Sequence, residues 1–169
     1  MLRRRREILT RLRELDHGIG GRKIRVHGDY HLGQVLRVKG DYVILDFEGE
    51  PMRSLEERRV KHSPLRDVAG MLRSFSYAAY AALLGYTARR PEEVERLEPW
   101  ARLWERSTSA EFRRAYREGM ATSDLLPGLE SGVDALLEGY LFDKALYELL
   151  YELENRPTWV RIPLWGLLS

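Results

Sequence analysis

The chain has 169 residues, of which 44% are hydrophobic and 32% charged, and a formal net charge of +2 at pH 7. This composition predicts one globular domain, residues 1–169, with a core of its own. The small net charge gives no indication of nucleic-acid or membrane partners, and no apolar run reaches the ~18 residues of a membrane span. The absence of cysteine excludes disulfides and thiol chemistry and fits a cytoplasmic protein.

The first segment, residues 2–15, has apolar residues three and four apart, which predicts an amphipathic helix. Its arginines at 3–6 could form a nucleic-acid patch, but Glu7 and Glu14 favour an ordinary solvated face. Glycines end this helix, and residues 23–26 then predict a short strand.

Residues 26–51 place two polar clusters on either side of two apolar runs. The runs contain β-branched and aromatic residues and are joined by Lys-Gly-Asp, which predicts a β-hairpin. Because a hairpin brings its two ends together, we expect Asp29, Gln34 and Asp46 to converge. Three oxygen-bearing side chains at one hairpin mouth suit a hard cation such as Mg²⁺ and a phosphate ester.

The rest of the chain predicts helices. Residues 51–62 are polar and irregular, and Ser63 and Pro64 are suitable as the N-cap and first residue of a long helix that ends near residue 84. Further helices are expected at 91–120 and 133–154, followed by a short apolar tail. The predicted fold class is α+β, mostly α, with one small hairpin that carries the candidate site.

The order of the polar residues resembles the catalytic segment of kinase-like phosphotransferases. In that family a loop aspartate accepts the proton of the acceptor hydroxyl, and a later amide and aspartate bind metal. The resemblance implies ATP as the donor, Asp29 as the catalytic base, and Gln34 and Asp46 as Mg²⁺ ligands. The loop reads His-Gly-Asp-x-His, closer to aminoglycoside and choline phosphotransferases than to protein kinases, which carry His-Arg-Asp.

Four longer blocks, in order, are similar to maltokinases: HGDYHLGQVL, ILDFEGEP, SPLRDVAGMLRSF and KALYEL with a later NRPxW. Maltokinases make maltose 1-phosphate from maltose and ATP in trehalose and glycogen metabolism, alone or fused to trehalose synthase. The resemblance covers residues 24–164. It implies the fold of a kinase C-terminal lobe and maltose as the acceptor.

Several other residues are candidates for supporting roles. We expect His27 to hold the loop by packing and hydrogen bonding, whereas His31 could either do the same or touch phosphate. The family resemblance implies that Asp67 is a hydrogen-bond acceptor that supports the catalytic loop. Glu48 and Glu50 could be solvated, or could support the metal site or bind sugar hydroxyls.

Aromatic residues near the C-terminus are candidates for the acceptor pocket, because aromatic rings stack well on sugar faces. Packing in the core or at an interface is an equally good explanation for each of them. The candidates are Tyr147, Tyr151 and Trp159.

A kinase also needs a nucleotide-binding lobe, and nothing before residue 23 supplies its phosphate loop and lysine. The sequence therefore predicts a C-terminal lobe whose N-terminal partner lobe is absent from the chain, so that the chain alone is inactive or nearly so. Two alternatives stay open. One is a phosphotransferase for another hydroxyl or aminoglycoside acceptor, and the other is a non-catalytic module that binds trehalose synthase or a maltosyltransferase.

Overall fold

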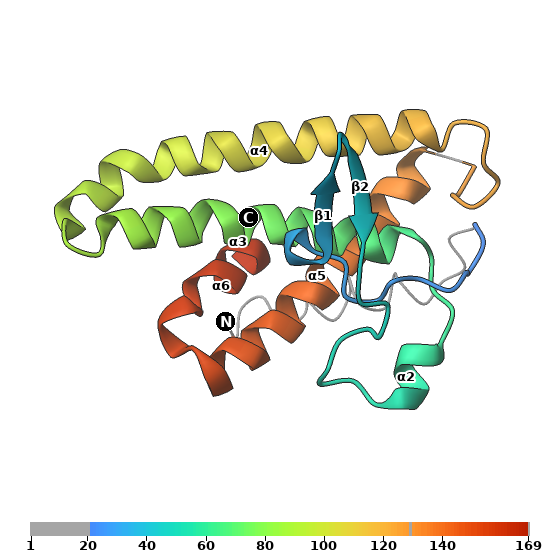
Figure 1. Ribbon diagram of the computed structural model, residues 1–169, viewed down its shortest axis with the longest axis horizontal. Helices are drawn as coiled ribbons and strands as arrows, with labels where there is room; N and C mark the ends of the chain where they lie inside the picture. Colours follow the sequence, from blue (N-terminus) through green and yellow to red (C-terminus); the bar gives the residue numbers. More distant parts are fainter. Residues whose placement is uncertain (1–20, 129, 169) are drawn as a thin grey trace.

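The structure is a computed structural model that describes residues 21–128 and 130–168 (Figure 1). The described chain is mostly helical, with one antiparallel pair of strands, which confirms the predicted α+β class. The helix predicted at residues 2–15 lies outside the described residues. Among the helices that are described, none is long and apolar enough to cross a membrane.

The elements comprise two strands, five α-helices and three short 3₁₀ turns (η) within the described residues. In chain order they are η2 (Leu32–Gln34), β1 (Val35–Val38), β2 (Asp41–Ile44), α2 (Leu55–Arg59), α3 (Leu65–Thr87), η3 (Pro91–Glu93), α4 (Val94–Gly119), α5 (Glu130–Asn155), η4 (Pro157–Trp159) and α6 (Arg161–Leu168).

Helix α3 is the centre of the fold. It packs against both α4 and α5, and α6 packs against α5 (Figure 1). Each fully buried aliphatic or aromatic side chain contributes about 1.5–3 kcal/mol of transfer free energy, so the contact between α3 and α5 contributes most to the stability of the fold. The largest buried cluster joins apolar residues of α3 and α5: Leu65, Val68, Ala69, Met71, Leu72, Phe75, Val133, Leu136 and Leu137.

The hairpin forms as predicted, and its turn explains its register. Lys39 and Gly40 both have positive φ, 50° and 92°, the geometry of the tight turns that match strand twist. The turn pairs Val35 with Ile44 and Val38 with Asp41. Both strands leave their side chains half-buried or exposed, so the hairpin has apolar residues open to solvent on both faces.

Two local expectations were wrong. Residues 23–26 form no regular strand, because Ile24 pairs with His62 in a single bridge. The segment expected to be irregular contains helix α2, which begins with a capping box in which Ser54 and Glu57 exchange side-chain-to-backbone hydrogen bonds. Both differences concern elements too short for hydrophobic periodicity to show them.

We predict that the chain self-associates through the hairpin, because contiguous exposed apolar surface is a common interaction site. Leu36 and Val43 face each other across the strands and are 48% and 44% exposed. A Leu36→Glu, Val43→Lys double variant keeps an attractive cross-strand pair and should be monomeric by sedimentation at concentrations at which the parent associates. The control is Leu150→Lys, at an exposed position of α5 (60%). A parent chain that stays monomeric would contradict the prediction.

Candidate active site

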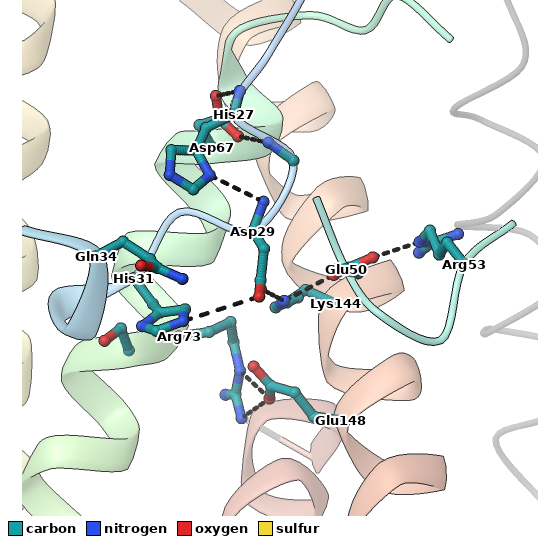
Figure 2. Close-up of polar contacts among 12 residues, drawn as sticks. His27, Asp29, His31, Gln34, Glu50, Arg53, Asp67, Arg73, Lys144 and Glu148 are labelled. Carbon is teal, nitrogen blue, oxygen red and sulfur yellow. Dashed lines mark hydrogen bonds and ion pairs between the residues drawn. The ribbon is translucent and has the colours of Figure 1, made fainter. Parts of the chain in front are cut away.

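The loop that carries Asp29 is held on the first turn of α3 by one carboxylate (Figure 2). The backbone N–H of His27 donates to Asp67 Oδ2 at 2.7 Å, and that of Gly28 donates to Asp67 Oδ1 at 2.9 Å. Two charge-assisted hydrogen bonds from consecutive amides fix both the position and the orientation of the loop relative to α3. The structure thus places Asp67 as the hydrogen-bond acceptor that holds the loop of the candidate base.

His27 ties the same loop to the end of the hairpin. Its ring is 5% exposed and packs against Phe47, with the ring centroids 4.7 Å apart. The Asp29 N–H donates to Nδ1 at 3.3 Å, so Nε2 carries the proton and donates to the Leu45 carbonyl at 2.6 Å. The imidazole therefore bridges the backbone N–H of Asp29 and the carbonyl of Leu45, the residue before Asp46.

Glycines permit close approaches on both sides of the loop. Gly28 has a φ of +85°, and a Cβ there would lie 3.2 Å from the Cα of Gly49. A Cβ on Gly70 of α3 would lie 2.6 Å from the Tyr30 carbonyl oxygen, which is too close for any side chain. Gly70 is the signal that sequence reasoning missed, because glycine is unfavourable inside a helix and its presence there indicates a packing reason.

Gln34 and Asp46 meet at the hairpin mouth as expected. Gln34 Nε2 donates to Asp46 Oδ2 at 2.9 Å, and the Leu45 N–H donates to the Gln34 carbonyl at 2.9 Å. Asp46 has a φ of +58°, a left-handed conformation that costs a non-glycine residue roughly 1–2 kcal/mol. Such strain is often found at functional sites.

The oxygens of this pair fit a hard cation such as Mg²⁺, which prefers oxygen ligands. They make a sparse site, since the described residues hold no group of three or more His, Cys, Asp or Glu suited to a metal. Gln34 and Asp46 would supply only part of the oxygen ligands of such a cation, and phosphate oxygens and water would have to supply the others.

Asp29, the third residue expected at the hairpin mouth, makes its side-chain contacts with other residues. Its Oδ1 accepts from Lys144 Nζ of α5 at 3.0 Å, and its Oδ2 lies 3.8 Å from His31 Nε2 (Figure 2). His31 Nδ1 in turn accepts from the Gly33 N–H at 3.0 Å. Sequence reasoning missed Lys144 as a site residue, although it begins the KALYEL block.

Glu50 is buried, with 2% of its surface exposed, and is not solvated. It accepts from Lys144 Nζ at 2.7 Å and from Arg66 at 3.3 Å, and it forms a close ion pair with Arg53. Burial alone would raise the pKa of Glu50, but Lys144 and Arg53 outweigh burial and lower it. Glu48, by contrast, is exposed.

A cavity of about 320 Å³ opens beside Asp29. Tyr147 and Tyr151 line it, whereas Trp159 is not among its lining residues and stacks between Tyr77, at 6.3 Å, and the Arg156 guanidinium, at 4.7 Å. Trp159 therefore supports the cavity wall. The other lining residues that matter for its chemistry are Lys144, Glu148, Glu152 and Arg156.

The acidic residues of the cavity wall are bound by cations. Arg73 Nε donates to Glu148 at 2.8 Å, and Arg156 Nε donates to Glu152 at 2.9 Å. Burial raises the pKa of the Glu148 carboxyl, and Arg73 opposes that shift. The acidic side chains of the cavity wall are thus all paired with cations.

Two of the known proteins that the chain matches carry the same description. No protein-family model matches the chain. It is 31% identical over 150 residues to a glucosamine kinase of Streptacidiphilus jiangxiensis and 35% identical over 139 residues to one of Mycolicibacterium smegmatis. These alignments cover 89% and 81% of the chain. The chain resembles glucosamine kinases. It spans about a third of the length of these relatives, 32% of each.

Solved structures show the same likeness in the fold. A glucosamine kinase superposes with a TM-score of 0.75 at 29% identity, over 96% of this chain and 37% of that protein. A glucosamine kinase in complex with glucosamine, ADP and inorganic phosphate superposes with a TM-score of 0.70 at 24% identity, over 96% of this chain and 46% of that protein. The chain therefore has the fold of part of these glucosamine kinases.

The docking of the loop on α3 can be tested with two glycines of the same helix. Gly70→Ala should destabilise the chain by about 1–3 kcal/mol, because its Cβ would meet the Tyr30 carbonyl oxygen at 2.6 Å. Gly85→Ala is the matched control. It has open space around its Cβ and should be stabilising by about 0.4–1 kcal/mol. Urea unfolding measures both, and equal effects at the two positions would show that the close approach is unimportant.

Proposed function

We propose that this chain forms the acceptor-binding and metal-binding lobe of an ATP-dependent sugar kinase. The observation that carries the proposal is the position of Asp29. This aspartate lines a cavity of about 320 Å³ and is held on α3, on a loop that His27 joins to the strand end next to Gln34 and Asp46. The similarity to glucosamine kinases supports a sugar as the acceptor.

Each of the candidate site residues would have its own role in the reaction. Asp29 would orient the acceptor hydroxyl and take its proton as the oxygen–phosphorus bond forms. The bond between the γ-phosphorus and the β,γ-bridging oxygen breaks, and ADP leaves. Gln34 and Asp46 would hold Mg²⁺, which when bound neutralises charge on the phosphates. A nucleotide-binding lobe outside these residues would complete the enzyme, and a fused trehalose synthase would be a further partner.

Maltose is our first candidate for the acceptor. Four sequence blocks resemble maltokinases, and the cavity that Asp29 lines is also lined by two tyrosines, Tyr147 and Tyr151. Its volume lies at the lower end of the ~300–1,000 Å³ typical of small-molecule sites. Glucosamine is the second candidate, because the relatives carry that name.

An acceptor assay tests the function and separates the two candidates. The chain, combined with its nucleotide-binding lobe, is incubated with ATP, Mg²⁺ and either maltose or glucosamine, and the sugar phosphate is identified by phosphorus NMR. We expect an anomeric phosphate from maltose. If glucosamine alone is phosphorylated, glucosamine and not maltose is the acceptor. If no sugar phosphate forms, the proposal is contradicted.

The role of Asp29 gives a second prediction for the same assay. Asp29→Asn should lower kcat by about 10²–10⁴-fold with little change in the KM for the sugar, because the amide keeps the shape of the carboxylate but cannot accept the proton. Asp124→Asn is the control, since the Asp124 side chain is 68% exposed and pairs with Arg22 at the surface. Wild-type turnover in Asp29→Asn would make Asp29 a structural residue.

A further inference from the structure

A second cavity lies outside the candidate active site, among residues of α3, α4 and α6. Its volume is about 580 Å³, within the ~300–1,000 Å³ typical of small-molecule sites. We call it the α4 cavity, because one face of that helix supplies much of its wall. Asp29, Gln34 and Asp46 do not line it. Its charged lining residues are Arg73 of α3 and Arg102, Glu105, Arg106 and Arg113 of α4.

The wall of the α4 cavity carries more positive than negative charge. Among the described lining residues there are four arginines and one acidic side chain, Glu105, which accepts a hydrogen bond from the Ser76 hydroxyl. Three of the arginines pair with Glu148, Glu98 and Asp134, and none of these carboxylates lines the cavity. The excess of positive charge suits an anionic ligand.

The arginines of α4 are available to such a ligand. The side chains of Arg102 and Arg113 are 45% and 40% exposed, and ion pairs this exposed add little stability, so they can be exchanged for a ligand. Arg106 lies one helical turn from Arg102, is exposed, and forms no ion pair with any described residue. The planar guanidinium group can make two parallel hydrogen bonds to phosphate oxygens.

Arg73 brings a buried guanidinium group to the same cavity. It is 5% exposed, and its Nε donates to Glu148 Oε2 at 2.8 Å (Figure 2). Its Nη1 has no hydrogen-bond partner within the described ranges. No buried side-chain nitrogen of these residues lacks a partner, so Nη1 is not enclosed. A Cβ on Gly166, which also lines the α4 cavity, would overlap Nη1, so glycine at this position leaves the nitrogen accessible.

The Arg73–Glu148 ion pair connects the two cavities. Arg73 lines the α4 cavity, whereas Glu148 lines the cavity beside Asp29. Nη2 of Arg73 lies 2.7 Å from Glu148 Oε2. An anion bound at Nη1 would compete with Glu148 for the charge of one guanidinium group.

We propose that the α4 cavity is a second ligand site, which binds a small phosphate-bearing anion, and that Arg73 couples it to the cavity beside Asp29. Inorganic phosphate and a sugar phosphate share the group that the arginines would bind. An anion in the α4 cavity weakens the hold of Arg73 on Glu148, and linkage makes the effect reciprocal. The site uses none of the proposed catalytic residues, so it goes beyond the sugar kinase function and does not depend on it.

Titration calorimetry of the full chain tests the site, first with inorganic phosphate and then with glucose 1-phosphate. Divalent cations and nucleotides are left out, so that Gln34 and Asp46 cannot hold the anion through a metal. We expect saturable binding of phosphate at one site. Tighter binding of glucose 1-phosphate would identify a sugar phosphate as the preferred ligand, and weaker binding would identify phosphate itself.

Two arginine variants locate the bound anion. Arg106→Gln should weaken phosphate binding by about 10-fold or more, because it removes a charged donor from the wall of the α4 cavity. Arg96→Gln is the matched control. It removes the same charge from α4 at a side chain that is 67% exposed and does not line the cavity, and it should leave the affinity unchanged.

A variant in the other cavity tests the coupling. Glu148→Gln should tighten phosphate binding by about 10-fold, because it removes the carboxylate that competes for Arg73. A gain in affinity cannot result from partial unfolding. Asp124→Asn makes the same change of net charge at the surface and is the control.

The outcomes separate the two parts of the inference. If neither anion binds saturably, or if Arg106→Gln and Arg96→Gln weaken binding equally, the anion site is wrong. If Glu148→Gln binds phosphate no more tightly than the parent, the coupling through Arg73 is wrong. Neither result affects the sugar kinase function, which the acceptor assay tests separately.

Discussion

The candidate site depends on two hydrogen bonds to one carboxylate. Asp67 accepts the amides of His27 and Gly28, which fixes the loop on the first turn of the most buried helix of the fold. The close approach of Gly70 to the Tyr30 carbonyl leaves the loop no room to shift along α3. The proposed phosphoryl transfer would depend mainly on positioning and charge stabilisation, so it would need a rigidly held base.

A second constraint is the balance of charge around Glu50. This buried carboxylate would be costly alone, and it is stable because Lys144, Arg53 and Arg66 reach it from three directions. Arg53 also pairs with Asp143 at 3.0 Å. The network joins the segment after the hairpin to α3 and α5, so the acceptor side of the site is held by ion pairs between distant parts of the chain.

The similarity to glucosamine kinases relates these residues to part of a longer protein. The chain matches about a third of the length of those relatives and carries the residues that would handle the acceptor and the metal. The apolar residues of the hairpin, open on both faces, lie next to Gln34 and Asp46. In the proposed enzyme, a lobe that bound ATP would therefore meet the chain beside Gln34 and Asp46, the proposed metal ligands.

The sequence alone determined the features that depend on near neighbours. The hairpin and its Gly-containing turn, the long helices and the Gln34–Asp46 pair follow from local patterns and a short loop. Tertiary structure decided the rest, because side chains far apart in sequence meet only through helix packing. Lys144 contacts Asp29 across 115 positions and Glu50 across 94. No periodicity or motif spacing encodes such contacts. Only the folded chain therefore showed the burial of Glu50, the place of Trp159 behind the cavity wall and the positive charge of Lys144 beside Asp29.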